Sequence, residues 1–211
     1  MKHIIDHIIH LSIFTLILVS TSHAITAKQS STGWGGSASK SIDGNTDGVH
    51  SHNSVSHTAG YTNYDWLLID LESVQNIDTI TLWNRTDSCC VHRINGTAVM
   101  VSDTPFNLAT TLQGLNDARN SSTWNTTIDN ANPDITLNLG GIRGRYILIQ
   151  KVGFKNDRKY LSIAEIEVRR ITKLNQGQRD FTLRYQTAHA GDIVTIGNTV
   201  LVTPVNQGAN V

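Results

Sequence analysis

The sequence predicts an all-β protein, a sandwich of short strands joined by long loops. Six short runs are rich in β-branched and aromatic residues, and turn-forming residues separate them. They are residues 66–71, 79–83, 98–101, 135–139, 146–152 and 163–168. No segment keeps the apolar periodicity of an amphipathic helix. Short strands without helices are typical of a β-sandwich, whose two sheets enclose one core.

The tryptophans and one long polar stretch complete this expectation. Trp66 and Trp83 fall within the strand-like runs, so we expect them to belong to the core. Residues 104–132 are polar and contain Pro105 and Gly114, which indicates an extended loop. Trp34 and Trp124 lie in polar segments, and the sequence does not show which part of the fold contains them.

The first 24 residues have the pattern of a secretory signal peptide. Lys2 supplies positive charge, residues 11–19 form an apolar centre, and Ser22-His23-Ala24 matches a small-x-small cleavage site. The apolar run is shorter than the roughly 20 residues that span a bilayer, which disfavours the alternative of a membrane anchor. No later segment could span a membrane. We therefore expect a protein that is secreted, or located at the cell surface or in the periplasm.

Residues 25–170 would form the sandwich domain, and residues 171–211 differ in character. They contain Asn-Gln-Gly-Gln at 175–178 and strand-like runs at 181–185, 193–196 and 199–202. This segment is too short for a core of its own. Two interpretations remain open. It is either a linker with the first strands of a truncated second β module, or an extension that packs on the domain or on another subunit of a homo-oligomer.

The charge balance excludes some classes of partner. Lys and Arg number 17, and Asp and Glu also number 17, so the chain has no net field to attract nucleic acid or anionic lipid. We expect no nucleic-acid partner. Two cysteines are too few for a disulfide framework, but in an oxidising compartment they would pair where geometry permits.

The segment at residues 84–93, NRTDSCCVHR, concentrates the polar chemistry of the chain. It holds both cysteines together with Arg85, Asp87 and Arg93, and it follows a strand-like run. Each guanidinium offers a flat fork of five donors, and two forks could straddle neighbouring hydroxyls and the ring oxygen of a sugar. Asp87 could hold one or both of them in place. The alternative is a surface ion pair beside two thiols.

The cysteines of this segment, Cys89 and Cys90, are adjacent. Neighbouring Cα atoms lie about 3.8 Å apart, below the usual disulfide range of about 4.4–6.8 Å. A bond between them would therefore form a tight, stiff ring. Such a ring could present a small apolar face to the C–H side of a sugar.

The segment resembles the signature loop of the F-type lectins, a family of fucose-binding lectins. Their signature begins with an upstream histidine, here His57 within SVSHT at 54–58, and continues with Arg-x-Asp, a Cys-Cys pair and a closing Arg or Lys. Three further segments resemble the family in the same order. They are IDGN at 42–45, DWLLIDL at 65–71 and YLSIAEIEV at 160–168. Together the matches cover about residues 25–170.

The resemblance implies a discoidin-like jelly roll that binds glycans and has no catalytic activity. Its ligands would be glycans that end in fucose or in a similar sugar such as galactose. The implied sugar-binding residues are His57, Arg85 and Arg93 for the hydroxyls and ring oxygen, Asp87 for orienting the arginines, and Cys89 with Cys90 as an apolar ridge.

The spacing of the signature departs from the family. Five residues, 88–92, separate Asp87 from Arg93, where the family motif has four. Two outcomes are open: Ser88 bulges outward without effect, or it moves Arg93 away from the sugar. The sequence also shows no counterpart of the family's pocket for the fucose methyl group, so specificity could have shifted toward galactose or another glycan.

Residues 40–54 are rich in oxygen ligands and contain no apolar run. Alone, such a segment is usually a solvated turn, although a hard cation such as Ca²⁺ prefers these ligands. The resemblance implies a structural Ca²⁺ at this segment. Its ligands would be the carbonyls of Lys40, Asn45 and Ala164 and the side chains of Asp43, Ser54 and Glu165. Ala164 stands where the family often has a cysteine, which removes a covalent link but keeps the carbonyl.

Two histidines of this segment invite another metal interpretation. His50 and His52 have the spacing of a zinc or copper pair, but no carboxylate or thiolate completes the set at a suitable distance. We expect both to be solvated.

Two other functional classes remain as alternatives. The first is an adhesion module that keeps the discoidin-like fold but binds protein, lipid or another glycan, because fold does not fix function. The second is a secreted hydrolase. Glu165 and Glu167 would point to opposite faces of a strand and make a poor acid/base pair, and no nucleophile or zinc-helix motif is present.

Overall fold

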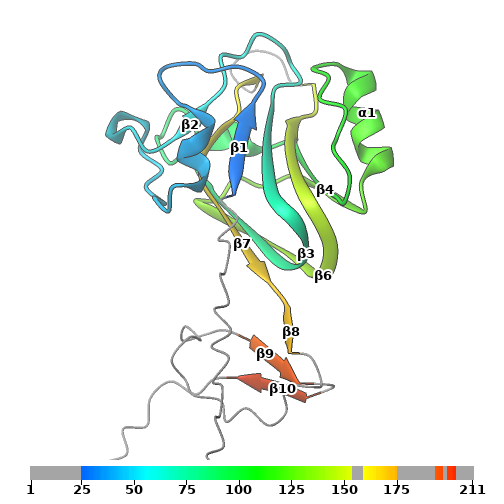
Figure 1. Ribbon diagram of the computed structural model, residues 1–211. Helices are drawn as coiled ribbons and strands as arrows, with labels where there is room; N and C mark the ends of the chain where they lie inside the picture. The colour runs from blue at the N-terminus through cyan, green and yellow to red at the C-terminus, as the bar shows by residue number, and fades with distance from the viewer. Residues whose placement is uncertain (1–24, 154–158, 175–192, 197–198, 203–211) are drawn as a thin grey trace, which may run out of the picture.

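The computed structural model describes residues 25–153, 159–174, 193–196 and 199–202 (Figure 1). The expected signal peptide and the strand-like run at 181–185 lie outside these residues. Within them, the protein is mostly antiparallel β-structure, so the predicted fold class is confirmed. None of the described helices is long and apolar enough to cross a membrane.

The main sheet has seven strands in the order β2-β7-β3-β6-β4-β5, with β1 paired to β3. The strands are β1 (Thr26–Gln29), β2 (Ser56–His57), β3 (Trp66–Asn84), β4 (Thr97–Ser102), β5 (Trp124–Ile128), β6 (Asp134–Lys151) and β7 (Ser162–Arg170). The two longest strands, β3 and β6, pair with each other along both of their halves. One half of the β3–β6 ribbon carries β1, β4 and β5, and the other half carries β7 and β2.

This pairing corrects the predicted strand list. The runs at 66–71 and 79–83 are two halves of β3, and those at 135–139 and 146–152 lie in β6. The chain bends without leaving the ladder, because Glu72, Gly140 and Gly141 take positive φ angles where the β3–β6 register shifts. The sequence showed the turn-forming residues, but it did not show that pairing continues across them.

The core lies between the two halves of the β3–β6 ribbon. Alternate residues of the strands are buried there, including Leu67, Ile69, Ile80, Leu82, Ile147, Ile149 and Ile163. Successive side chains of a strand point to opposite faces, so a strand with one buried face buries every second residue. Trp66 and Trp83, which we expected in the core, are partly buried.

A helix was missed in the polar stretch at 104–132. Helix α1 (Leu112–Ser121) begins at Thr111, whose hydroxyl oxygen accepts a hydrogen bond from Gly114 N at 3.0 Å. It covers a second apolar cluster on the outer side of β4 and buries only Gly114, Leu115 and Ala118 (Figure 1). Two of these three are too small to produce an apolar signal. The same stretch also contains β5, which gives Trp124 a place opposite Val101 of β4.

Loops and short helical turns gather at the end of the sandwich that carries β2. The oxygen-rich segment contains two 3-10 turns, η1 (Ala38–Ile42) and η2 (His50–His52), and the signature loop contains a third, η3 (Val91–Ile94). After the sandwich, β8 (Thr172–Leu174), β9 (Ile193–Ile196) and β10 (Thr199–Val202) form a separate three-stranded sheet. The last two coincide with predicted runs, while the domain boundary at residue 170 stays a prediction.

Candidate functional site

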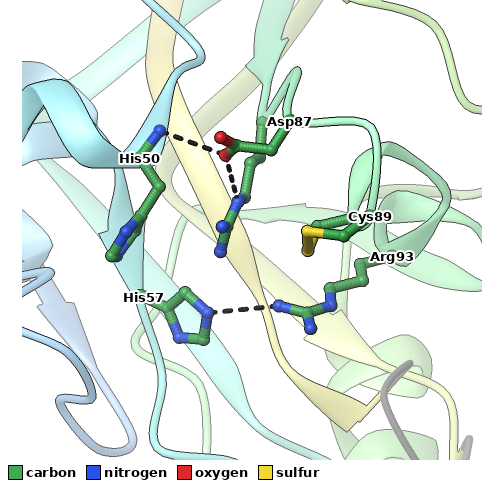
Figure 2. Close-up of a disulfide and its surroundings, with 7 residues drawn as sticks. His50, His57, Asp87, Cys89 and Arg93 are labelled. Atoms are coloured by element: carbon green, nitrogen blue, oxygen red, sulfur yellow. Dashed lines mark hydrogen bonds and ion pairs between the residues drawn. A yellow bond between two sulfur atoms is a disulfide. The ribbon is translucent and has the colours of Figure 1, made fainter.

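A hollow of about 320 Å³ lies beside β2, and the signature loop forms one of its walls. Its lining residues come from four separate segments: Trp34, His50, His57, Arg85, Cys89, Cys90, Arg93 and Tyr160. Five of the six residues proposed from the sequence as sugar-binding are among them. The sixth, Asp87, is hydrogen-bonded to both Arg85 and His50 (Figure 2).

Asp87 fixes two walls of this pocket at once. Its Oδ2 atom accepts hydrogen bonds from Arg85 Nε at 2.6 Å and from the backbone N–H of His50 at 3.1 Å. Burial acts to raise the pKa of Asp87, but these two donors outweigh burial and leave that pKa below its usual value. The carboxylate is therefore charged at neutral pH and holds the Arg85 guanidinium toward the pocket.

His57 presents a hydrogen-bond acceptor at the floor of the pocket. It is 3% exposed, and its Nδ1 lies 2.6 Å from the carbonyl oxygen of Thr58. Because a carbonyl only accepts, Nδ1 carries the proton and Nε2 presents an acceptor lone pair. Arg93 donates to this Nε2 at 3.3 Å.

The charge state of His57 follows from its surroundings. Burial is the largest cause that lowers the pKa of His57, and the nearby Arg85 and Arg93 act in the same direction. Although the bond to Thr58 opposes them, the pKa falls to about 4. The imidazole is therefore neutral at physiological pH. The pocket thus combines one neutral acceptor with two permanently charged donors, the set that sugar hydroxyls need.

Cys89 and Cys90 are joined by a disulfide, with their Cα atoms 3.8 Å apart. The alternative of two thiols is therefore wrong. Cys89 is exposed, Cys90 is buried, and both line the pocket. Next to the polar groups, the disulfide supplies a small apolar surface.

The extra residue in the signature loop does not displace Arg93 from the pocket. Ser88 is exposed in a turn that is closed by a hydrogen bond from Cys90 N to Asp87 O at 2.8 Å. The chain then enters η3, which returns Arg93 to the side of His57. Of the two outcomes left open by the sequence, the outward bulge is the one that occurs.

The sequence did not assign three of the lining residues to the site. His50, expected to be solvated, instead faces His57 with ring centroids 5.5 Å apart. Trp34 lies 4.7 Å from the His57 ring and 5.3 Å from the Tyr160 ring, measured between centroids. Arg93 stacks over Tyr160 at 4.9 Å. Tyr160 opens one of the family-like segments, and this position was the one available signal for it.

His52 takes no part in the pocket. Its Nδ1 lies 2.6 Å from Asp47 Oδ2 on the surface. Within the described part of the chain, no group of three or more His, Cys, Asp or Glu residues is arranged to hold a metal ion. The zinc or copper interpretation of His50 and His52 therefore gains no support.

Two of the proposed calcium ligands, Asp43 and Glu165, lie close together. The buried Glu165 of β7 accepts a hydrogen bond at Oε2 from Gly44 N at 2.9 Å, which brings β7 against the end of η1. Burial raises the pKa of Glu165, and the nearby Asp43 carboxylate raises it further. Two carboxylates held close together in this way would be stabilised by a cation.

The backbone around Glu165 also fits a cation. Trp83 pairs with Glu165 and Asn84 with Ile163, so Ala164 is the extra residue of a bulge and stays outside the β3–β7 ladder. Ser54, which follows η2 in the sequence, is buried, and its Oγ donates a hydrogen bond to the carbonyl of Val49. The proposed donors are all oxygen atoms, the kind that Ca²⁺ prefers. The residues present therefore fit this ion.

Comparisons with known proteins identify the family. The family described as the NedA-like, galactose-binding domain of F5/F8 type C matches residues 40–149. The chain belongs to this family. The match spans the segment from η1 to the second half of β6, which includes the pocket residues His57, Arg85 and Arg93.

Relatives of this galactose-binding domain include fucose-binding proteins. Fucolectin-5 of Anguilla japonica is 32% identical over 135 residues, which cover 64% of each protein. Fucolectin-3 of the same organism is 42% identical over 64 residues, which cover 34% of that protein. The chain thus spans less than two thirds of the length of these relatives. The resemblance to the F-type lectins is confirmed.

Solved structures with this fold agree with the sequence comparison. The fucose binding module SpX-3 of Streptococcus pneumoniae is 26% identical, with a TM-score of 0.56 over 70% of this chain and 94% of that module. The lectin domain of lectinolysin, solved in complex with Lewis B antigen, is 27% identical, with a TM-score of 0.56 over 70% of this chain and 93% of that domain.

Proposed function

We propose that this galactose-binding-like domain is a lectin for terminal fucose, and that a structural calcium ion supports it. The observation that carries the proposal is the pocket itself. A buried, neutral His57 accepts, Arg85 and Arg93 donate, and the Cys89–Cys90 disulfide adds an apolar surface. Sites for small molecules typically combine a few convergent polar groups with an apolar wall in this way.

The chemistry of a sugar fits this set of groups. A hydroxyl that displaces the Arg93 N–H from His57 Nε2 can donate to Nε2 and accept at the same time from the released Arg93. The second arginine, Arg85, can reach a neighbouring hydroxyl or the ring oxygen. Hydrogen bonds from charged donors are stronger than neutral ones. A C–H face of the ring would lie against the disulfide. The similarity to fucolectin-5 and to a fucose binding module favours fucose, and galactose-containing glycans are the second ligand to test.

The pocket supports binding without catalysis. Among the described residues that line it, none is Asp or Glu. Glu165 is buried and its neighbour Glu167 on β7 is exposed, so these two do not form an acid/base pair. A non-catalytic lectin needs neither group in the pocket.

Secretion and multivalency belong to the proposal. Disulfides persist in oxidising compartments, so the Cys89–Cys90 bond supports export of the chain. A site for one sugar buries few atoms and binds weakly. Several copies on one surface, for example in a homo-oligomer, would raise the effective affinity for a cell surface that carries many glycans.

Calorimetric titration of L-fucose into the full chain tests the proposed specificity. We expect saturable binding at pH 7 that is weaker for D-galactose and undetectable for D-glucose. Affinity for L-fucose should stay constant from about pH 8 to pH 5, because His57 remains neutral with its pKa lowered to about 4. Below about pH 5, protonation of Nε2 removes the acceptor, and binding should fall.

Two results would contradict this proposal. A loss of affinity between pH 7 and pH 6 would mean that His57 titrates with an ordinary pKa and is not buried as described. A chain that circular dichroism shows to be folded, but that binds no sugar from a broad glycan panel, would favour the adhesion module instead.

Calcium is tested by thermal unfolding with Ca²⁺ and with a chelator. We expect the chelator to lower the Tm of the natural chain by several degrees, since a ligand that binds only the folded state stabilises it. Glu165→Gln should remove the response to Ca²⁺. In chelator, this variant should be as stable as the natural chain or more so, because it no longer buries a carboxylate near Asp43.

The control for this test is Glu167→Gln, a change at an exposed position on the same strand. It should keep the full response to Ca²⁺. Equal responses of both variants would show that Glu165 does not bind the ion.

A further inference from the structure

The loop after β1 holds a tryptophan in an unfavourable backbone conformation. Gly36 N donates to Gly33 O at 2.9 Å, which closes a turn whose central residues are Trp34, with φ of 49°, and Gly35, with φ of 70°. Turns with two positive φ angles prefer Asn, Asp or Gly. A bulky aromatic residue in this region is a true outlier, and such strain tends to be kept where function requires it.

The turn is tied to the floor of the pocket. Gly33 N donates to the carbonyl of His57, and His57 N donates to the carbonyl of Gly36, each at 2.8 Å. A Cβ atom on Gly36 would lie 2.5 Å from His57 N, so the two backbones are in direct contact. Gln29 donates from its side chain to the same Gly36 carbonyl at 2.8 Å. The position of Trp34 relative to His57 is therefore fixed.

The Trp34 side chain lines the pocket and is also exposed to solvent. One part of it packs on His57 and Tyr160, yet the residue is 63% exposed. His57, by contrast, is 3% exposed, and the Arg85 side chain is 12% exposed. The hydrogen-bonding groups are thus largely buried, while Trp34 beside them is mostly exposed to solvent.

We propose that Trp34 is the platform for a second sugar residue, the one linked to the sugar that occupies the pocket. This inference rests on the lectin function proposed above and extends it to an oligosaccharide. The flat indole would pack on the C–H face of that second ring, and its fixed position lowers the entropic cost of the contact. The role of Trp34 in glycan binding would then explain why a strained residue is kept in this turn.

The test compares one monosaccharide with one oligosaccharide, L-fucose and the Lewis B oligosaccharide. The variants are Trp34→Asn, which removes the ring and suits the positive φ, and Trp34→Tyr, which keeps an aromatic face. Asn53 already occupies such a conformation in this chain, with φ of 63°. We expect Trp34→Asn to weaken Lewis B binding by about 3- to 10-fold more than it weakens L-fucose binding.

Two further measurements complete the test. Trp34→Asn should keep or raise the Tm, because it relieves the strained turn, so a loss of oligosaccharide affinity cannot reflect unfolding. Trp34→Tyr should keep most of the Lewis B affinity. Both variants are measured as the full chain in Ca²⁺.

Three outcomes would overturn the inference. An equal loss for L-fucose and Lewis B would place the ring against the first sugar, and no loss for either would show that the ring takes no part. A natural chain that binds neither ligand would overturn the lectin function itself, which separates that failure from failure of the second subsite.

Discussion

Replacing Lys151 with methionine is expected to destabilise the protein by about 3 kcal/mol or more and to weaken sugar binding. Lys151 is fully buried at the end of β6. Its ammonium donates to the carbonyls of Arg93 and Asn95 and to Thr97 Oγ1, at 2.5, 3.1 and 3.0 Å. Methionine has a similar length but no donor, so these acceptors, of which Thr97 is fully buried, would lose their partner. The cost is about 1–3 kcal/mol for each buried group left unpaired.

The effect on binding follows from where these carbonyls lie. Arg93 belongs to η3 and Asn95 directly follows it, so Lys151 holds the end of the turn that carries one of the two pocket arginines. Without the ammonium, the turn would gain freedom, and Arg93 would donate less reliably to the pocket. We expect the affinity for L-fucose to fall at least about fivefold at a temperature where the variant is still folded.

Urea unfolding and calorimetry measure the two effects of Lys151→Met separately. Lys28→Met is the control, because Lys28 is exposed on β1 and the chemical change is the same. If both variants were equally stable, the buried ammonium would have no structural role. If Lys151→Met lost stability but kept its affinity, Arg93 would be positioned by other contacts.

Lys151 also illustrates what the sequence could not provide. At the end of an apolar strand, a lysine usually reaches solvent. Its partners lie more than 50 residues earlier in the chain, and only the β4–β6 pairing brings them together. His50 and Trp34 were missed for the same reason, since each contacts the pocket through the ring of His57. Local composition carries no information on such contacts.

The parts that could be predicted are local or family-specific. Arg85, Asp87 and the cysteine pair lie within six residues of one another, and their proximity on one loop follows directly from the sequence. The strand cores were visible from their β-branched residues. The continuity of β3 and β6 was not visible, because a bend at Glu72 or at Gly140 looks like the end of a strand when the partner strand is unknown.

Replacing Arg85 with alanine is expected to abolish detectable sugar binding. The Arg85 side chain is 12% exposed and is held by Asp87 through Nε, which leaves the terminal nitrogens to donate to a ligand. Removing a charged donor costs about 1.5–3 kcal/mol of binding free energy for each hydrogen bond that is lost, or about 10- to 150-fold in affinity. A monosaccharide that already binds weakly would then fall below the range of calorimetry.

Arg85→Lys separates charge from geometry. Lysine keeps the positive charge but has a single ammonium, which cannot hold Asp87 and also present a planar fork to two sugar oxygens. We therefore expect Arg85→Lys to lose at least about tenfold in L-fucose affinity. The affinity of both variants for L-fucose is measured by calorimetric titration, after both have been shown to be folded to the same extent.

The matched control is Arg143→Ala, since Arg143 pairs with Asp103 on the surface and its side chain is 67% exposed. This variant carries the same change in net charge and should bind L-fucose as the natural chain does, because an exposed pair contributes little. If Arg85→Ala retained full affinity, the sugar would not contact this arginine, and the pocket formed by the signature loop would not be the binding site. If Arg85→Lys retained it while Arg85→Ala did not, a positive charge alone would suffice, and the planar fork held by Asp87 would not be required.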